Sequence, residues 1–141
     1  MTNCLFCRIT SGELPAHKVA ETENLVAFLD LHPIRPGHTL IVPRAHHVWF
    51  EDMPAPLAAE VMEMCQHIAR AQKKLYEVER VAMFFTGIHV PHVHAHVLPM
   101  HHVHDVTSAA YMKDGPEGYS VPTSLAAEDM TGIARELAAA L

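Results

Sequence analysis

The sequence predicts an α+β domain, an antiparallel sheet with helices on one side, and three observations lead to this fold class. Short runs rich in β-branched and aromatic residues alternate with turn residues, which is typical of strands joined by tight connections. One long segment, residues 54–76, repeats apolar residues at helical spacing. At positions 92–96, histidines alternate with small or β-branched apolar residues, as they would along a strand.

Length and composition limit the possible classes of protein. The 141 residues suffice for one domain with a core and are too few for two, so we expect a single domain over residues 1–141. The formal net charge of −6 argues against a nucleic-acid-binding surface. We expect neither a signal peptide nor a membrane span, because no basic start leads into an apolar stretch and no apolar run approaches about 18 residues. Three cysteines, an odd number, fit the reducing cytoplasm.

The first strands are predicted to form a β-hairpin. Residues 19–21 and 25–30 contain strand-forming residues, and Thr22-Glu23-Asn24 supplies a polar turn between them. Asp30 ends the second strand, where a carboxylate can accept hydrogen bonds from the two hydroxyls of a ribose. The alternative interpretation of Asp30 is a solvated turn residue.

A third strand, a long helix and a fourth strand follow the hairpin. Pro36-Gly37 is a turn signal, and His38 then opens the β-branched-rich run 39–42. Residues 81–85 form another apolar strand. The helix over 54–76 is amphipathic, with an apolar stripe that steps by three and four: Leu57, Val61, Met64, Ile68, Ala71 and Leu75.

The C-terminal part, residues 101–141, is predicted to be a loop followed by a helix. Residues 126–140 carry acidic residues early and Arg135 late, which the helix dipole favours. Gly115-Pro116-Glu117-Gly118 is typical of a loop. Three histidines at the start of this part are either solvated or a second, weak metal site: His101, His102 and His104.

The segment Val90–Pro99 is predicted to be a strand bracketed by Pro91 and Pro99. His92, His94 and His96 would then share one face, whereas a chance histidine-rich strand is the alternative without function. The first and third Cα atoms would lie about 13 Å apart at a rise of about 3.3 Å per residue. Zinc binds nitrogen at about 2.0–2.1 Å, so the three cannot share one ion and their roles are divided.

This chain resembles the histidine triad (HIT) nucleotide hydrolases and transferases. The motifs that carry the resemblance occur in the family's order: Cys4-Leu5-Phe6-Cys7-Arg8-Ile9, Gly12-Glu13-Leu14-Pro15-Ala16, Ala27-Phe28-Leu29-Asp30, Pro36-Gly37-His38-Thr39-Leu40-Ile41-Val42-Pro43-Arg44 and His92-Val93-His94-Ala95-His96-Val97-Leu98. They cover about residues 4–100, and the resemblance implies a HIT-like five-stranded sheet with two main helices. It also implies a homodimer.

The pair Cys4 and Cys7 has the spacing of half a zinc site or of a redox pair. A redox pair usually accompanies a βαβ pattern, which is not evident here, and two inert buried cysteines are a further alternative. In CxxC-bearing members of the family the partners are two histidines, and the resemblance places them at His46 and His92. The predicted site would hold structural zinc.

The resemblance also assigns roles around the phosphate and the purine. The middle histidine, His94, has neighbours on both sides to orient it and would be the nucleophile, with His96 as proton donor and His38 supporting the phosphate site. His89 and the backbone N–H of Val90 would contact phosphate. Four apolar residues match the family's purine pocket: Phe6, Ile9, Phe28 and Leu31. Many members carry Gly-Gln where this chain has Gly87-Ile88, and Ile88 cannot make the glutamine's hydrogen bond.

These observations predict an enzyme that hydrolyses purine nucleoside phosphoramidates or dinucleoside polyphosphates. Attack at the α-phosphate would give a nucleotidyl-histidine, and water would then release nucleoside monophosphate, with no metal required for the chemistry. Three alternatives stay open: a nucleotidyltransferase, a hydrolase that uses the histidines as metal ligands, and a non-catalytic nucleotide-binding or adaptor module.

Overall fold

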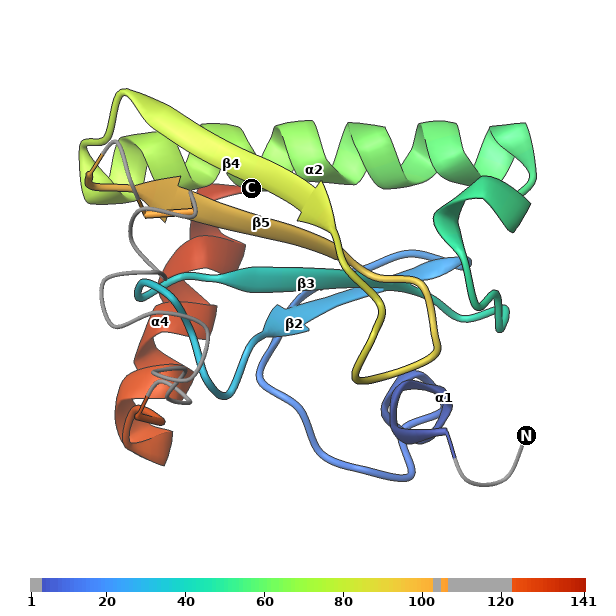
Figure 1. The fold of residues 1–141 in the computed structure, drawn as a ribbon. Helices are drawn as coiled ribbons and strands as arrows, with labels where there is room; N and C mark the ends of the chain where they lie inside the picture. Colours follow the sequence, from blue (N-terminus) through green and yellow to red (C-terminus); the bar gives the residue numbers. More distant parts are fainter. Residues whose placement is uncertain (1–3, 103–104, 107–122) are drawn as a thin grey trace, which may run out of the picture.

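The computed structural model describes residues 4–102, 105–106 and 123–141 and has the predicted α+β fold (Figure 1). Five antiparallel strands form one sheet in the spatial order β1-β2-β3-β5-β4. The strands are β1 (Lys18–Glu21), β2 (Leu25–Leu29), β3 (Thr39–Pro43), β4 (Arg80–Phe85) and β5 (Ala95–Met100). The helices are α1 (Leu5–Thr10), the 3-10 helix η1 (Phe50–Asp52), α2 (Ala55–Tyr76) and α4 (Ala127–Ala140). The loop predicted at residues 115–118 and His104 lie outside the described residues.

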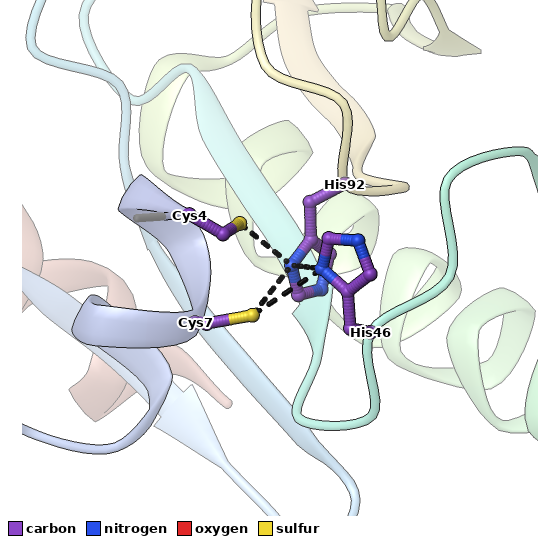
Figure 2. A group of neighbouring side chains, drawn as sticks. All are labelled: Cys4, Cys7, His46 and His92. Carbon is purple, nitrogen blue, oxygen red and sulfur yellow. Dashed lines mark hydrogen bonds between the residues drawn. The ribbon is translucent and has the colours of Figure 1, made fainter. Parts of the chain in front are cut away.

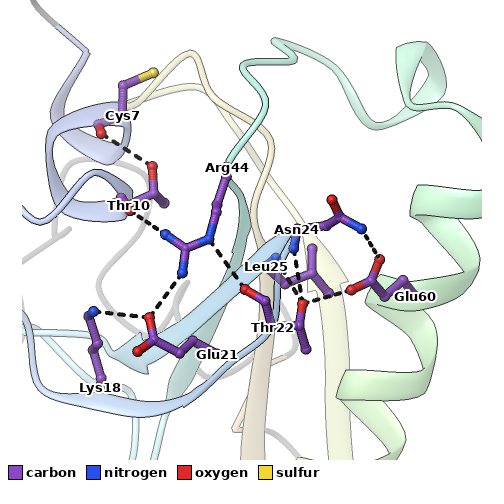
Figure 3. Close-up of polar contacts among 9 residues, drawn as sticks. All are labelled: Cys7, Thr10, Lys18, Glu21, Thr22, Asn24, Leu25, Arg44 and Glu60. Atoms are coloured by element: carbon purple, nitrogen blue, oxygen red, sulfur yellow. Dashed lines mark hydrogen bonds and ion pairs between the residues drawn. The ribbon is translucent and has the colours of Figure 1, made fainter.

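The predicted hairpin is confirmed, and its turn is fixed by Thr22. The Thr22 hydroxyl oxygen accepts the backbone N–H groups of Asn24 and Leu25 at 3.3 and 3.0 Å. The Thr22 hydroxyl and the Asn24 amide also donate to the Glu60 carboxylate of α2 at 2.7 and 2.9 Å (Figure 3). These bonds lower the pKa of Glu60 and join the hairpin turn to the long helix.

Helices lie on both faces of the sheet, so the prediction of helices on one side holds only for the two main ones. Successive residues of β2 point to opposite faces. Leu25, Ala27 and Leu29 pack in the core formed with α2 and α4, whereas Val26 and Phe28 pack against α1. Helix α1 escaped prediction because six residues are too few for a periodic signal.

The stripe predicted along α2 faces the sheet as expected. Val61, Met64, Ile68 and Ala71 are buried, and the partly buried residues at both ends of the stripe pack on the same core. Gln72 is also fully buried, and its amide donates to the carbonyl oxygens of Gly37 and Val97 at 2.9 and 3.0 Å. Within the described ranges, no helix is long and apolar enough to cross a membrane.

Arg44 connects helix α1 to the hairpin. Its guanidinium donates to the Thr10 carbonyl at the end of α1 at 2.5 Å and to the Glu21 carboxylate at 2.9 Å (Figure 3). Glu21 also pairs with Lys18 at 3.1 Å. This network fixes α1, which carries Cys7 and directly follows Cys4, against the edge of the sheet.

The strand predicted from Val90 begins only at Ala95, so the expectation of three histidines along one flat strand is wrong. His92 N–H donates to the Val90 carbonyl at 2.8 Å, and Val93 N–H donates to the His47 carbonyl at 2.7 Å. These bonds hold a bent segment before β5. Pro99, expected to end the strand, lies inside β5 opposite Val81. It is tolerated because the register between β3 and β5 ends at Val97, so Pro99 has a single neighbouring strand.

Candidate active site and metal cluster

His94 is held in one tautomer by the backbone before it. Its Nδ1 lies 2.7 Å from the carbonyl oxygen of His92, and a carbonyl can only accept. The proton of the neutral ring is therefore on Nδ1, and the lone pair is on Nε2 at the opposite edge. His94 is buried and lines a cavity of largely apolar residues, so the ring orientation and the position of its lone pair are fixed there.

A chain of hydrogen bonds fixes the tautomers of His38 and His96. Ile34 N–H donates to His38 Nδ1 at 3.2 Å, so the proton of His38 is on Nε2. That nitrogen lies 2.9 Å from His96 Nδ1, which must accept. His96 consequently carries its proton on Nε2, 3.1 Å from the Thr86 hydroxyl oxygen. His96, the third histidine of the triad, thus presents its Nε2–H as a hydrogen-bond donor.

Burial keeps these three histidines neutral. It lowers the pKa of His38 and His94, and it lowers the pKa of His96 to about 3, with the neighbouring histidines adding to the shift at His96. Neutral imidazoles offer one lone pair and one N–H each at pH 7. A bound phosphate anion would raise the pKa of His96, so that the ring would hold a second, transferable proton only when such an anion is bound.

Two aromatic rings flank the histidines on different sides. Phe6 of α1 meets the His94 ring edge-on, with ring centroids 4.9 Å apart. Phe84 of β4 stacks on the His96 ring at 4.7 Å and 11°. Since Phe6 belongs to the cluster on the α1 face and Phe84 to the outer strand, the two histidines stand between two distinct regions of the cavity.

One cavity of about 1420 Å³ brings together every residue predicted for catalysis or substrate binding. These residues all contribute to its lining: Phe6, Ile9, Phe28, Asp30, Leu31, His38, His89, Val90, His94 and His96. Phe6, Ile9 and Phe28 pack in one apolar cluster, and Val90 contacts it from the loop before the triad. The cavity thus has a predominantly apolar wall with histidines at one side, as small-molecule sites commonly do.

Asp30 is half-buried at the mouth of this cavity and has a local role in the turn. One carboxylate oxygen accepts the backbone N–H of His32 at 2.9 Å, and the other lies 3.8 Å from His38 Nδ1. The backbone N–H of Asp30 donates to the His38 carbonyl at 2.9 Å. The turn role and a ribose-binding role are compatible, because a carboxylate offers about four acceptor positions.

The four residues predicted to bind metal meet in one cluster (Figure 2). Their ligand atoms all lie within 4.8 Å of one another. The Sγ atoms of Cys4 and Cys7 lie 3.4 and 3.5 Å from His92 Nδ1, and His46 Nδ1 lies 3.2 Å from it and 3.3 Å from Cys7 Sγ. Tetrahedral ligands of zinc stand about 3.3–3.8 Å apart, given bonds of about 2.0–2.3 Å.

The orientation of His92 also fits a metal ligand. Its Nε2 lies 2.9 Å from the carbonyl oxygen of Pro43 and donates to it, so Nδ1 carries the lone pair. A hydrogen bond of this kind on the far nitrogen is the usual support of a metal-binding histidine. His92 is fully buried and does not line the cavity. The roles of the three histidines are therefore divided between two clusters, as predicted. The cause of the division is the bend before β5 and not the length of a flat strand.

Several supporting residues escaped prediction because their partners lie far away in the sequence. Thr86 bonds His96, and Gln72 links the turn before His38 to β5. Arg35 forms two hydrogen bonds with Asp105, at 3.0 and 2.5 Å, and thereby holds the segment that supplies Val106 to the cavity wall. An isolated Thr, Gln or Arg–Asp pair gives no local signal in a sequence.

The three alternating histidines lead into β5, which is the fourth strand of the five in spatial order. This arrangement defines a histidine triad protein, and the comparison with known families agrees. A family model described as HIT domain matches residues 11–103. The chain belongs to the HIT family.

Individual relatives support the same assignment. An uncharacterized HIT-like protein of Methanocaldococcus jannaschii is 37% identical over 100 residues, which cover 68% of this chain and 78% of that protein. An adenosine 5'-monophosphoramidase of Saccharomyces cerevisiae is 35% identical over 97 residues, which cover 68% of this chain and 61% of the yeast protein. The crystal structure of a zinc-bound histidine triad family protein from Mycobacterium smegmatis matches with a TM-score of 0.74 at 28% identity, covering 99% of this chain and 93% of that one.

Proposed function

We propose that this chain hydrolyses purine nucleoside phosphoramidates or dinucleoside polyphosphates at the α-phosphate through a nucleotidyl-histidine intermediate. The observation that carries the proposal is the fixed tautomer of His94, whose Nε2 lone pair borders the cavity. Membership of the HIT family and the similarity to a yeast adenosine 5'-monophosphoramidase support a nucleotide hydrolase in general.

The first step is displacement at phosphorus by His94. Its Nε2 lone pair forms a bond to the α-phosphorus while the bond from phosphorus to the leaving nitrogen or oxygen breaks. The leaving atom takes the electron pair of that bond and a proton from His96 Nε2, and the His96 ring enters this step as an imidazolium because the bound phosphate anion raises its pKa. The His94 ring becomes cationic, and its Nδ1–H donates to the His92 carbonyl, which stabilises the positive charge.

The second step reverses the roles of the two rings. Water attacks the phosphorus, its proton passes to His96, and the bond between phosphorus and His94 Nε2 breaks. Nucleoside monophosphate leaves, and both histidines return to their starting tautomers. The His38 ring, whose Nε2 lies 2.9 Å from His96 Nδ1, packs against the His96 ring and keeps it in place.

The apolar end of the cavity would hold the purine and its sugar. Phe6, Phe28 and Leu31 give flat or branched apolar surfaces for the base, and Asp30 stands where it can accept from ribose hydroxyls. Leu31 is 58% exposed, so it has apolar surface left to cover when a base binds. The homodimer implied by the family resemblance stays a prediction for this chain.

The cluster of Cys4, Cys7, His46 and His92 would bind a structural zinc ion. Four protein ligands leave no open coordination position, so such an ion supplies folding energy and no bound water for chemistry. It would connect α1 to the segment before β5 and so help to place the His92 carbonyl against His94.

The covalent intermediate is the sharpest test. Wild-type protein, mixed with adenosine 5'-phosphoramidate and quenched in base within milliseconds to seconds, should gain the mass of one adenylyl group on the peptide that contains His94. His94→Ala should lose about 10⁴-fold or more in kcat, because the covalent route disappears. Nucleotide affinity should survive, since binding involves the other cavity residues.

The matched control is His67→Ala, which removes an exposed histidine on α2 outside the cavity. This control should keep wild-type turnover. A purified His94→Ala protein with activity within about tenfold of wild type would rule out His94 as the nucleophile.

A further inference from the structure

The region of the cavity beyond His96 is apolar. The leaving group takes its proton from His96 Nε2 in the proposed function, so it must lie near that nitrogen, which is 3.1 Å from the hydroxyl oxygen of Thr86 in the turn after β4. The cavity residues on this side come from β4 and the turn after it, and Phe84 and Ile88 give it two apolar side chains.

Ile88 is the main surface that a leaving group can cover there. It is 86% exposed, the highest value among the exposed large apolar side chains of the described ranges, and yet it lines the cavity. A substrate group placed against it would remove apolar area from water, which is favourable. A single exposed isoleucine far from a cavity would not indicate a binding surface.

The cavity is poorly suited to a chain of phosphates. Its lining includes no Lys or Arg among the described residues, and its one carboxylate, Asp30, is negative. The nearby cation Arg35 is paired with Asp105. A polyphosphate would bring several negative charges to a site with no compensating cation, which is costly in a partly buried place, whereas one phosphate anion can be satisfied by N–H donors.

We infer that this site selects nucleoside 5'-monophosphates joined to a single apolar amine, with Ile88 as the residue that determines specificity for the leaving group. The inference rests on the proposed function and narrows it: of the two substrate classes, phosphoramidates with apolar substituents are favoured and dinucleoside polyphosphates are not. The bond that breaks is the P–N bond, and the amine departs with the proton from His96.

The test compares kcat/KM for four substrates with the wild-type protein. They are adenosine 5'-phosphoramidate, its N-phenethyl derivative, its N-carboxymethyl derivative and diadenosine tetraphosphate. The phenethyl compound should exceed the unsubstituted amide by about tenfold, as expected for covering one aliphatic side chain with an aromatic ring. The carboxymethyl compound and diadenosine tetraphosphate should both fall below the unsubstituted amide.

Substitution of Ile88 then assigns the preference to this residue. Ile88→Gln should lower the ratio of kcat/KM for the phenethyl compound to kcat/KM for the unsubstituted amide by about tenfold. Ile88→Leu should restore the preference. Leu141→Gln, the same kind of change at an exposed residue outside the cavity, should alter neither. The side chain of Ile88 is largely in solvent, so these variants should keep the wild-type melting temperature.

Two results would overturn the inference while leaving the proposed function intact. One is wild-type preference for diadenosine tetraphosphate over both neutral amides, and the other is an equal loss on all substrates in Ile88→Gln. In either case turnover of the unsubstituted amide would still depend on His94. If none of the four compounds is turned over, the proposed function is wrong and this inference is wrong with it.

Discussion

Gly37 is expected to tolerate no side chain, and the cost of adding one can be worked out from its surroundings. It has φ of +90°, and a Cβ built there would lie 2.5 Å from Tyr76 Oη and 2.6–2.7 Å from two ring carbons. Alanine in this backbone conformation costs about 1 kcal/mol, and the overlap with the partly buried Tyr76 ring costs about 1–3 kcal/mol more. Gly37→Ala should therefore lower the free energy of unfolding by about 2–4 kcal/mol.

Urea unfolding followed by circular dichroism measures this loss, and two other glycines provide controls. Gly12 has φ of +84° but no atom within 4 Å of an added Cβ, so Gly12→Ala should cost about 1 kcal/mol. Gly132 lies inside α4 with the same open space, so Gly132→Ala should stabilise by about 0.5–1 kcal/mol. Equal losses in Gly37→Ala and Gly12→Ala would refute the contribution assigned to Tyr76.

Two further predictions concern the metal cluster and the buried histidines. The Cys4→Ser, Cys7→Ser double variant should lose the zinc that elemental analysis detects and should melt at a lower temperature. Its loss of turnover should be smaller than that of His94→Ala. Zinc well below one equivalent per chain in untagged wild-type protein would contradict the metal site. The pKa of His96 is lowered to about 3, against about 6.5 in an unfolded chain, so the unfolded state binds the proton first and stability falls as pH drops between these values. His96→Gln should reduce the slope of unfolding free energy against pH by up to about 1.4 kcal/mol per pH unit between pH 6 and 4, and an unchanged slope would contradict the burial assigned to His96.

The parts of the fold that could be predicted from sequence are those with a local signal. The hairpin around Thr22 has two β-rich runs and a polar turn, and α2 has a long amphipathic period, so both appear close to the predicted positions. Cys4 and Cys7 were predicted as metal ligands from their spacing, and His46 and His92 were predicted as their partners from the family resemblance. Its geometry agrees with that set, although its occupancy stays a prediction.

The parts that escaped prediction depend on contacts across the fold. The alternation of histidines predicted a strand from Val90, but hydrogen bonds to Val90 and His47 bend the chain until Ala95. Likewise, the tautomer of His96 follows from Ile34 N–H through the His38 ring, which no periodicity encodes. Chemistry-bearing side chains could be named from the sequence, whereas the protons that they carry could be assigned only from their neighbours.

The position of His92 has a consequence for when the site forms during folding. Its ring meets Cys4 across 88 positions of the chain, and its carbonyl fixes the next histidine, His94. Contacts between residues so distant in sequence form only after the intervening chain has been brought together. We therefore expect His94 to reach its fixed tautomer late in folding, after the N-terminal helix has docked against the segment before β5.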